Sequence, residues 1–384
     1  PARVRDFDPR QLDERGALGQ LVWVGAGALG ERDGRIALYR RERAALLLEP
    51  PAPPAELAPL ARALLDHLAR RGASFFGELV GAASAAGAGD PEREALEALW
   101  DLVWAGLVTN DTFAPLRALA ARGRQESARA RRPGRHGAGA ALAAAGRWSL
   151  VAQLADPPAD PTRRAHARAL ALLDRWGVVA RDALEVEAIP GGFSAVYPVL
   201  RAMEESGRLR RGHFVEGLAG AQFAFAGAVD QLRAARAPAA RDGGAAGRST
   251  PEALVLAACD PANPFGALLP WPPSHVPEAR PRRAAGASVV LVDGLPVLFL
   301  DRAGRQATTF AAAHEEPDAF PAAAGALRML LLDRRRRGLR IERIDGVPAL
   351  DSPLREAFLA AGFRAEYKGL ALDRFGAEPT PGAP

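Results

Sequence analysis

The sequence predicts an α+β protein in which tandem winged helix-turn-helix domains are followed by a C-terminal β-barrel-like α+β module. Two segments each combine three short helices, bounded by glycine or proline, with a following hairpin, and this order is typical of a winged helix. A third segment, at the start of the chain, has only the hairpin of such a unit. From about residue 250 the pattern changes to short apolar strands separated by Asp-Gly and Ala-Gly turns.

Residues 1–50 are predicted to be the end of a truncated winged-helix unit, whose earlier helices we expect upstream. Residues 9–15 indicate the end of a helix, and LVWVG pairs with RIALYRR through a turn at Asp33-Gly34. Gly25–Gly30 matches GxGxxG after a strand, but a second strand follows where a dinucleotide site needs a helix. We therefore exclude a Rossmann site and expect a flexible, glycine-rich wing tip.

Residues 51–120 are predicted to form a complete winged-helix domain. Leucines at helical spacing indicate a first helix over 55–71, a short helix follows, and a third begins at Pro91. The string LVTNDTF predicts the wing, with a tight turn at Asn110-Asp111. The third helix is acidic, so we expect it to pack against another element rather than to contact phosphates. Its acidic residues are Glu92, Glu94, Glu97 and Asp101.

Residues 121–160 are predicted to be a linker rich in Arg, Ala and Gly. Between residues 117 and 147 the chain holds eight arginines, among them Arg131 and Arg132, against one acidic residue. Such a block is typical of a solvated, mobile linker. It also suits the tracking of a phosphate backbone, and the two interpretations are compatible.

Residues 161–234 are predicted to form the second complete winged helix, and a short linker, 235–250, follows it. The third helix is expected over 193–206, and the wing RLRRGHFVEG turns near Arg211-Gly212. Arginines cluster at this helix and wing, the parts of a winged helix that commonly contact the grooves and backbone of DNA. The predicted nucleic-acid-binding residues here are Arg201, Arg208, Arg210 and Arg211.

Residues 251–384 are predicted to form the β-rich module. The string ASVVLVDGLPVLFLDRAGRQATTF indicates strands joined by tight turns, a helix follows over 320–337, and FRAEYKGLALDR indicates a final hairpin. Two acidic residues lie in ordered-looking segments of this module, Asp260 in DPANPFG and Asp373 in LALDR.

Composition excludes several classes of function. Lys368 is the only lysine, so no GxxxxGK[ST] loop exists and we expect no ATP hydrolysis by this chain. The single cysteine, Cys259, excludes an intrachain disulfide, and the six histidines are scattered, so we expect no metal site. No apolar run is long enough to span a membrane, so we expect a cytoplasmic protein. A net charge of +5 favours an anionic partner.

The catalytic chemistry that stays open is a carboxylate that activates water. No GxSxG nucleophile elbow is present. The candidate carboxylates are Asp13, Asp260 and Asp373. Gln11-Leu12-Asp13 resembles the Gln-x-Asp signature of tandem winged-helix DNA glycosylases, but a place in the helix before a wing accounts for Asp13 without catalysis, and we favour that interpretation.

Five strings, taken together, resemble the C-terminal region of bacterial Lhr-type (large helicase-related) proteins. They are LVWVGAGALGERDGRIALYRR, ALWDLVWAGLVTNDTFAPLRAL, GGFSAVYPVLRAMEESGRLRRGHFVEGL, DPANPFGALLPWP and SPLREAFLAAGF. The resemblance implies the nucleic-acid-binding and oligomerisation region of an ATP-dependent DNA-repair helicase that moves 3′ to 5′. It implies that ATP and magnesium serve only an upstream motor, so we expect no cofactor in this chain.

The same resemblance implies several partners: DNA, an RNA–DNA hybrid, upstream helicase domains of the same protein, and further copies of the chain, tetramers among them. It implies a nucleoid-associated location. The region is also similar to AlkZ-type tandem winged-helix glycosylases, and some family members are associated with uracil-DNA glycosylase activity. Three hypotheses therefore stay open: a binding and oligomerisation region, a DNA glycosylase that acts without ATP, and a protein-interaction scaffold that does not bind nucleic acid.

Overall fold

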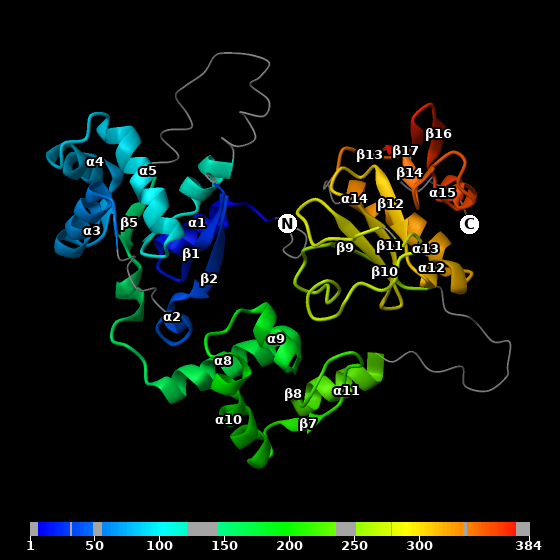
Figure 1. Cartoon of the computed structure of the whole chain (residues 1–384), viewed down its shortest axis with the longest axis horizontal. Coiled ribbons are helices and arrows are strands. Elements are labelled where there is room, and N and C mark those ends of the chain that lie inside the picture. Colours follow the sequence, from blue (N-terminus) through cyan, green and yellow to red (C-terminus); the bar gives the residue numbers. More distant parts are fainter. Residues whose placement is uncertain are drawn as a thin grey trace. The chain divides into compact units, whose positions relative to one another are not determined.

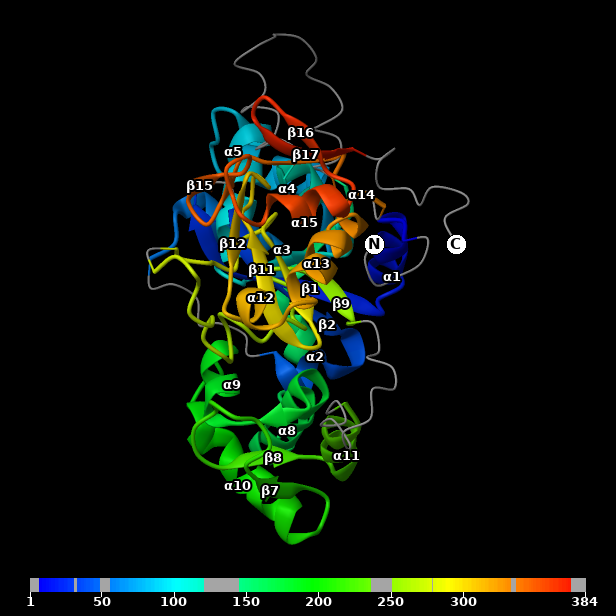
Figure 2. The ribbon, with the colours of Figure 1, turned by 90° about the vertical axis from the view of Figure 1, so that its right-hand side faces the viewer.

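The structure is a computed structural model, shown from two directions in Figures 1 and 2. It describes residues 7–30, 33–48, 56–120, 145–235, 251–277, 279–332 and 336–373. The chain divides into two compact units, residues 1–171 and residues 172–384. Within the described ranges, no helix combines the length and the apolar character that a membrane crossing requires.

Three helices and a small sheet form a winged helix in the first unit, as the sequence predicts. The helices pack around Leu64, Leu79 and Leu99, none of which has exposed surface. Gly72 ends the first helix with a φ of 79°, a conformation that favours glycine. The strands have the order β3-β5-β4. The elements are α3 (Pro59–Arg71), β3 (Ser74–Phe75), α4 (Phe76–Ala85), α5 (Pro91–Trp104), β4 (Val108–Asn110), β5 (Arg147–Leu150) and η1 (Val151–Ala155).

The predicted tight turn at Asn110-Asp111 is wrong. Strand β4 pairs with β5, which begins only at Arg147, rather than with the residues that directly follow β4. Burial explains the pairing, because Trp148 of β5 has no exposed surface and meets Trp100 edge-on at 6.1 Å between ring centroids. Strand β5 and η1 therefore lie within the range 121–160 that the sequence predicts as linker.

The predicted N-terminal hairpin is confirmed, and its strands pair antiparallel. Asp33 lies opposite Gly30 and Gly34 lies opposite Ala28, so both residues belong to strand β2 and the predicted turn at Asp33-Gly34 is wrong. Gly25 is not part of a flexible tip: a Cβ at this position would lie 1.8 Å from the Val103 carbonyl oxygen of α5. The close approach of two backbones requires glycine there. The elements are α1 (Arg10–Ala17), β1 (Leu21–Gly30), β2 (Asp33–Arg40) and α2 (Arg41–Leu47).

The second complete winged helix is confirmed, with the strand order β6-β8-β7. Its wing loop is wider than predicted, because β7 ends at Gly212 and β8 begins only at Gln222. The fully buried Gln222 side chain holds this loop: it accepts a hydrogen bond from Phe214 N at 2.7 Å and donates one to Val215 O at 2.8 Å. The elements are α8 (Pro161–Trp176), β6 (Val178–Val179), α9 (Arg181–Val186), α10 (Gly192–Glu205), β7 (Arg210–Gly212), β8 (Gln222–Ala224) and α11 (Ala226–Ala235).

The C-terminal module is built on an open six-stranded sheet, and its described strands form no closed barrel. The order β15-β14-β12-β11-β10-β9 leaves β15 and β9 as separate edges. Closure fails because the chain leaves the sheet after β12 through helices and returns as β14, parallel to β12. The elements are β9 (Ala253–Ala257), β10 (Ser288–Val292), β11 (Leu295–Leu300), β12 (Gln306–Thr309), α12 (Ala312–Glu315), α13 (Ala319–Ala326), α14 (Met329–Leu332), β14 (Arg343–Ile344) and β15 (Val347–Pro348).

A second, three-stranded sheet in this module has the order β13-β17-β16 and contains the predicted final hairpin (Figure 1). One face is buried through Leu339, Ile341, Leu370 and Leu372. Because side chains alternate along a strand, the residues between these point to the opposite face. Asp373, at the end of the middle strand, belongs to that opposite face. The remaining elements are β13 (Gly338–Ile341), α15 (Arg355–Ala360), β16 (Arg364–Glu366) and β17 (Gly369–Asp373).

Candidate functional sites

The four arginines predicted to bind nucleic acid lie at the end of α10 and around β7, and all are exposed. Two of them have acidic partners. The Nε of Arg201 donates to Glu205 Oε1 at 2.7 Å, and this hydrogen bond raises the pKa of Arg201. The Nη1 of Arg210 lies 3.9 Å from the Asp230 Oδ1 of α11. These two guanidinium groups are already partly neutralised.

Arg208 and Arg211 form no ion pair with any residue that the structure describes. A guanidinium of this kind donates to a phosphate without first breaking an ion pair, and its planar fork suits phosphate oxygens. The backbone beneath the site is fixed, because Arg208 N donates to Met203 O at 2.9 Å. The other two predicted binding residues, Arg131 and Arg132, lie outside the described residues.

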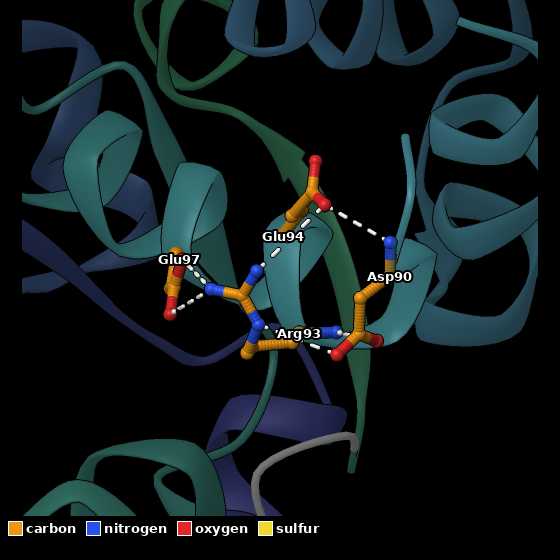
Figure 3. Close-up of polar contacts among 4 residues, drawn as sticks. All are labelled: Asp90, Arg93, Glu94 and Glu97. Atoms are coloured by element: carbon orange, nitrogen blue, oxygen red, sulfur yellow. Dashed lines mark hydrogen bonds and ion pairs between the residues drawn. The ribbon is translucent and has the colours of Figure 1, made fainter. Parts of the chain in front are cut away.

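Helix α5, the third helix of the other winged helix, has the opposite charge at its start (Figure 3). Arg93 Nη1 donates to both oxygens of Glu97 at 3.1 and 3.0 Å, and its Nε donates to Asp90 at 3.3 Å. Its Nη2 lies 3.7 Å from Glu94. The hydrogen bond with Glu97 raises the pKa of Arg93. One guanidinium contacts three carboxylates. The excess negative charge is favourable at a helix N-terminus, and it repels phosphates.

Asp13 makes contacts that join two parts of the first unit. Its Oδ1 accepts a hydrogen bond from Phe113 N at 2.8 Å, and Arg117 donates to both carboxylate oxygens. The contacts tie α1 to the residues that follow β4. Both oxygens are occupied, which supports the interpretation of Asp13 as a structural residue of the helix before the wing.

Asp260 lies in a tightly bonded loop after β9. Its Oδ1 accepts a hydrogen bond from Ala262 N at 2.8 Å, and its carbonyl oxygen accepts one from Arg283 Nη2 at 3.1 Å. The neighbouring Asn263 is fully buried and donates from Nδ2 to Ala258 O at 2.9 Å. The carboxylate closes a turn of this loop.

Asp373 lines a surface pocket of about 330 Å³ over the three-stranded sheet. The floor is β17, where Ala371 lies opposite Arg340 on one neighbouring strand and Arg364 on the other. Arg364 pairs with the Asp373 carboxylate. Arg340 Nη2 reaches across β17 to Glu366 Oε2 at 2.7 Å. The pocket thus has a small-residue floor between charged side chains, one of which is a candidate catalytic carboxylate.

The tip of the β16–β17 hairpin extends beside this pocket. Tyr367 is 96% exposed there, next to Lys368. The hairpin is held against β13, because a Cβ at Gly369 would lie 2.1 Å from Ile341 O, and Gly369 has a φ of 133°. An exposed aromatic ring and a cation therefore stand at the tip of the hairpin, at the opposite end of β17 from Asp373. In the described part of the chain, no group of three His, Cys, Asp or Glu side chains is arranged to hold a metal ion.

Two winged-helix domains of the large helicase-related protein (Lhr) match the chain. The fourth Lhr winged helix matches residues 158–243, and the third matches residues 1–41. The "Lhr helicase/ probable uracil glycosylase" of Mycolicibacterium smegmatis is 42% identical over 97% of this chain. The "Lhr helicase/uracil glycosylase" of Escherichia coli K12 is 37% identical over 96% of it. The chain belongs to the Lhr family.

Membership of the Lhr family confirms the resemblance that the sequence shows and sharpens the domain assignment. The fourth Lhr winged helix covers α8 to α11, which include the arginine cluster. The third covers α1 and the β1–β2 hairpin, so that hairpin is confirmed as part of a winged helix. The chain spans about a quarter of the length of the two relatives, 25% and 24%.

One polar cluster of this Lhr chain, at the end of β12, is not predicted by the sequence. The buried Thr309 Oγ1 donates to Asp345 Oδ2 at 2.7 Å and lies 2.8 Å from His314 Nε2. A hydroxyl has one hydrogen, so the His314 Nε2 must carry a proton and donate to Oγ1. The His275 ring stacks on His314 at 4.3 Å between centroids. These residues come from three separate segments, and no local pattern in the sequence joins them.

Proposed function

We propose that this chain is the nucleic-acid-binding region of an Lhr-type DNA-repair helicase, and that the fourth Lhr winged helix makes the main contact. The observation that supports this most directly is the exposed cluster at α10 and β7, in which Arg208 and Arg211 have no acidic partner among the described residues. In winged helices these parts reach the groove and the backbone. We propose that Arg131 and Arg132 of the predicted linker also bind phosphates.

The ligands we propose are DNA and RNA–DNA hybrids. Longer relatives are named helicases, so the motor that uses ATP and magnesium is proposed to lie elsewhere in the whole protein, with no cofactor bound to this region. The net charge is +5, and all basic residues except Lys368 are arginines; this composition supports an anionic partner.

The test is the affinity of the chain for labelled single strands, duplexes and hybrids, measured by fluorescence anisotropy over a range of salt. Arg208→Ala with Arg211→Ala should weaken binding roughly ten-fold or more and lower the slope of log K against log salt by about two. The matched control, Arg70→Ala with Arg71→Ala, removes two exposed arginines from the other winged helix. It should leave the affinity and the salt slope unchanged. Equal losses in the two variants would refute the assignment to α10 and β7.

A second activity is supported by the pocket at Asp373 and by the names of the relatives, both of which include uracil glycosylase. We propose that a uracil turned out of a strand enters this pocket and that the Asp373 carboxylate activates a water or stabilises positive charge on the sugar. Arg364 would position the carboxylate. Tyr367 and Lys368, at the tip of the hairpin, would contact the same strand farther from the flipped base, since exposed rings stack on bases.

This second activity is tested by incubating the chain, without ATP, with uracil-containing DNA and resolving the alkali-treated strands on a gel. Asp373→Asn should abolish cleavage and leave DNA affinity unchanged. Asp13→Asn and Asp260→Asn are the comparisons, because both carboxylates are used in structural contacts. Cleavage that survives Asp373→Asn but is lost in either of the other variants would move the activity to that residue.

Self-association is the remaining part of the proposal. Strand β9 is an edge of the six-stranded sheet, and its Leu254 is 52% exposed. An apolar edge strand readily pairs with another strand, and a second copy of the chain would supply one. Sedimentation velocity should show an oligomer for the wild-type chain and a smaller species for Leu254→Lys. An unchanged distribution would place the interface elsewhere.

A further inference from the structure

The loop between β9 and β10 covers the face of the six-stranded sheet opposite the helices. Trp271 is its main anchor: the indole stacks on Phe310 at 5.9 Å between centroids, with an interplanar angle of 3°. It also meets Phe299 of β11 edge-on at 5.6 Å. These rings form a separate apolar cluster from the one that packs against α13. The loop is therefore an ordered layer that packs on the sheet of the module.

Hydrogen bonds fix the rest of this loop. Arg283 Nη1 donates to Asn263 O at 2.6 Å, and its Nη2 donates to Asp260 O. On the other side of Trp271, His275 N donates to Thr309 O at 2.9 Å, and Ser274 forms a β-bridge with Phe310. A surface held at both ends in this way is preorganised, so little entropy is lost when a ligand binds to it.

This fixed loop contains a pocket of about 470 Å³ that the proposed activities do not use. Its lining includes an indole ring and four pyrrolidine rings, those of Trp271, Pro272, Pro273, Pro277 and Pro281. Its described lining has no residue in common with that of the Asp373 pocket. The volume lies within the usual range of ligand sites, and a lining of apolar rings suits an aromatic ligand ring.

Arg280 also lines the pocket and supplies a cation. Its Nη1 donates to the carbonyl oxygens of Pro277 and Ala279, which closes the turn and fixes the guanidinium. Its Nε and Nη2 make no hydrogen bond to any described residue. An apolar pocket lined by rings and one guanidinium fits a ligand that joins an aromatic ring to an anion.

We propose that this pocket, between Trp271 and the proline rings, binds one unpaired base of single-stranded nucleic acid, with Arg280 on an adjacent phosphate. The inference rests on the proposed binding of nucleic acid. Base stacking on aromatic side chains, combined with arginine contacts to the backbone, is how proteins hold single strands without reading sequence. The pocket shares no described lining residue with the Asp373 pocket, so we propose that it anchors the strand rather than processing the base.

The experiment is photocrosslinking of the full chain to a single-stranded oligonucleotide that carries one 5-iodocytosine, followed by mapping of the crosslinked peptide by mass spectrometry. A cytosine analogue keeps the probe independent of uracil cleavage. We expect the crosslink on Trp271. Ala279→Leu fills the pocket without removing an anchor ring, and it should lower the yield at Trp271 roughly ten-fold. The control, Arg282→Ala, changes an exposed arginine of the same loop that does not line the pocket and should leave the yield unchanged.

The experiment distinguishes failure of the proposed winged-helix contact from failure of the proposed base pocket. Arg208→Ala with Arg211→Ala should lower affinity but keep the crosslink on Trp271 when the oligonucleotide is saturating. Crosslinks that map only to other peptides, or an unchanged yield in Ala279→Leu, would overturn the inference. A proline-rich peptide that binds the wild-type chain but not Ala279→Leu, with no crosslink to the oligonucleotide at Trp271, would overturn it in favour of a peptide site.

Discussion

Helices α5 and α10 occupy the same position in two winged helices of this chain, yet their surroundings differ. Both are the third helix of the unit, where a winged helix commonly contacts DNA. Helix α5 buries six side chains, and α10 buries three. The buried residues of α5 are Ala95, Ala98, Leu99, Trp100, Leu102 and Val103, and those of α10 are Val196, Leu200 and Met203.

The difference arises from the β1–β2 hairpin, which packs on α5. Gly25 of β1 meets the backbone at Val103, and Gly34 of β2 lies under the ring of Trp104, where a Cβ would come within 2.4 Å. A helix covered on this side by a hairpin cannot enter a groove. The position of a helix in a fold is therefore a weaker guide to DNA binding than the elements that cover it.

The two helices also differ in charge, and this difference again favours α10 over α5 as the helix that contacts DNA. The N-terminal turns of α5 hold Glu92 and the acidic set around Arg93. The N-terminal half of α10 has no charged residue, and its exposed side there is formed by Ser194, Ala195 and Pro198. Helix α10 leads directly into the basic strand β7, whereas α5 leads into β4, which has no basic residue and is followed by the arginine-rich stretch 117–147. We infer that α5 is a scaffold helix and α10 a contact helix.

The largest expected effect tests the covering of α5. Gly25→Ala places a methyl group against the Val103 carbonyl, where no flexible side chain can give way, and should cost about 3 kcal/mol or more of stability. Hydrogen exchange should rise in peptides of β1 and α5 and stay unchanged in α10. Urea unfolding would give the free energy.

The matched control is Gly30→Ala, an identical change on the same strand. No atom lies within 4 Å of a Cβ at Gly30, so the cost should be under about 1 kcal/mol. If both substitutions destabilise the chain equally, the hairpin is not pressed against α5 as described, and the contrast between the two helices loses its structural basis.

Much of each winged helix could be predicted because its signals are local. The spacing of leucines and the glycine stops report helices directly, and α10 falls within one residue of its predicted range, 193–206. The basic character of the β7 wing is likewise visible in the string RLRRGHFVEG. The resemblance to Lhr proteins is also carried by contiguous strings.

Other features could not be predicted because they depend on distant residues. Strand β5 follows an arginine-rich stretch of the kind that indicates a linker, and only the burial of Trp148 against α5 shows that it belongs to the sheet. The pocket at Asp373 brings together β13, β17 and a residue as distant as Arg305. The barrel-like part of the prediction is not confirmed, for a related reason: alternating strands indicate a sheet, whereas closure depends on which edges meet.

An intermediate effect is expected when the charge of the two helices is exchanged. Ala195→Glu with Ala202→Glu places two carboxylates on the exposed side of α10, beside the basic wing, and should weaken binding to DNA roughly ten-fold at low salt. Anisotropy titration measures this. In the reverse change, Glu92→Gln with Glu97→Gln makes α5 less acidic and should leave affinity within about two-fold. A gain of affinity in the α5 variant would show that α5 is accessible to DNA after all.

The smallest expected effect concerns the cap of α5. Asp90 accepts a hydrogen bond from Arg93 N at 3.4 Å and precedes Pro91 at the first turn, whereas the residue before α10, Gly191, provides no side-chain cap. Asp90→Ala should cost about 1 kcal/mol, and Asp90→Ser should restore most of it, because serine caps a helix without the charge. Thermal unfolding measures both, and affinity for DNA should not change in either. The loss should stay small because the buried side of α5, not its cap, holds the helix in place; a large loss in Asp90→Ala that serine does not restore would mean that the ion pairs of Arg93 hold α5 instead.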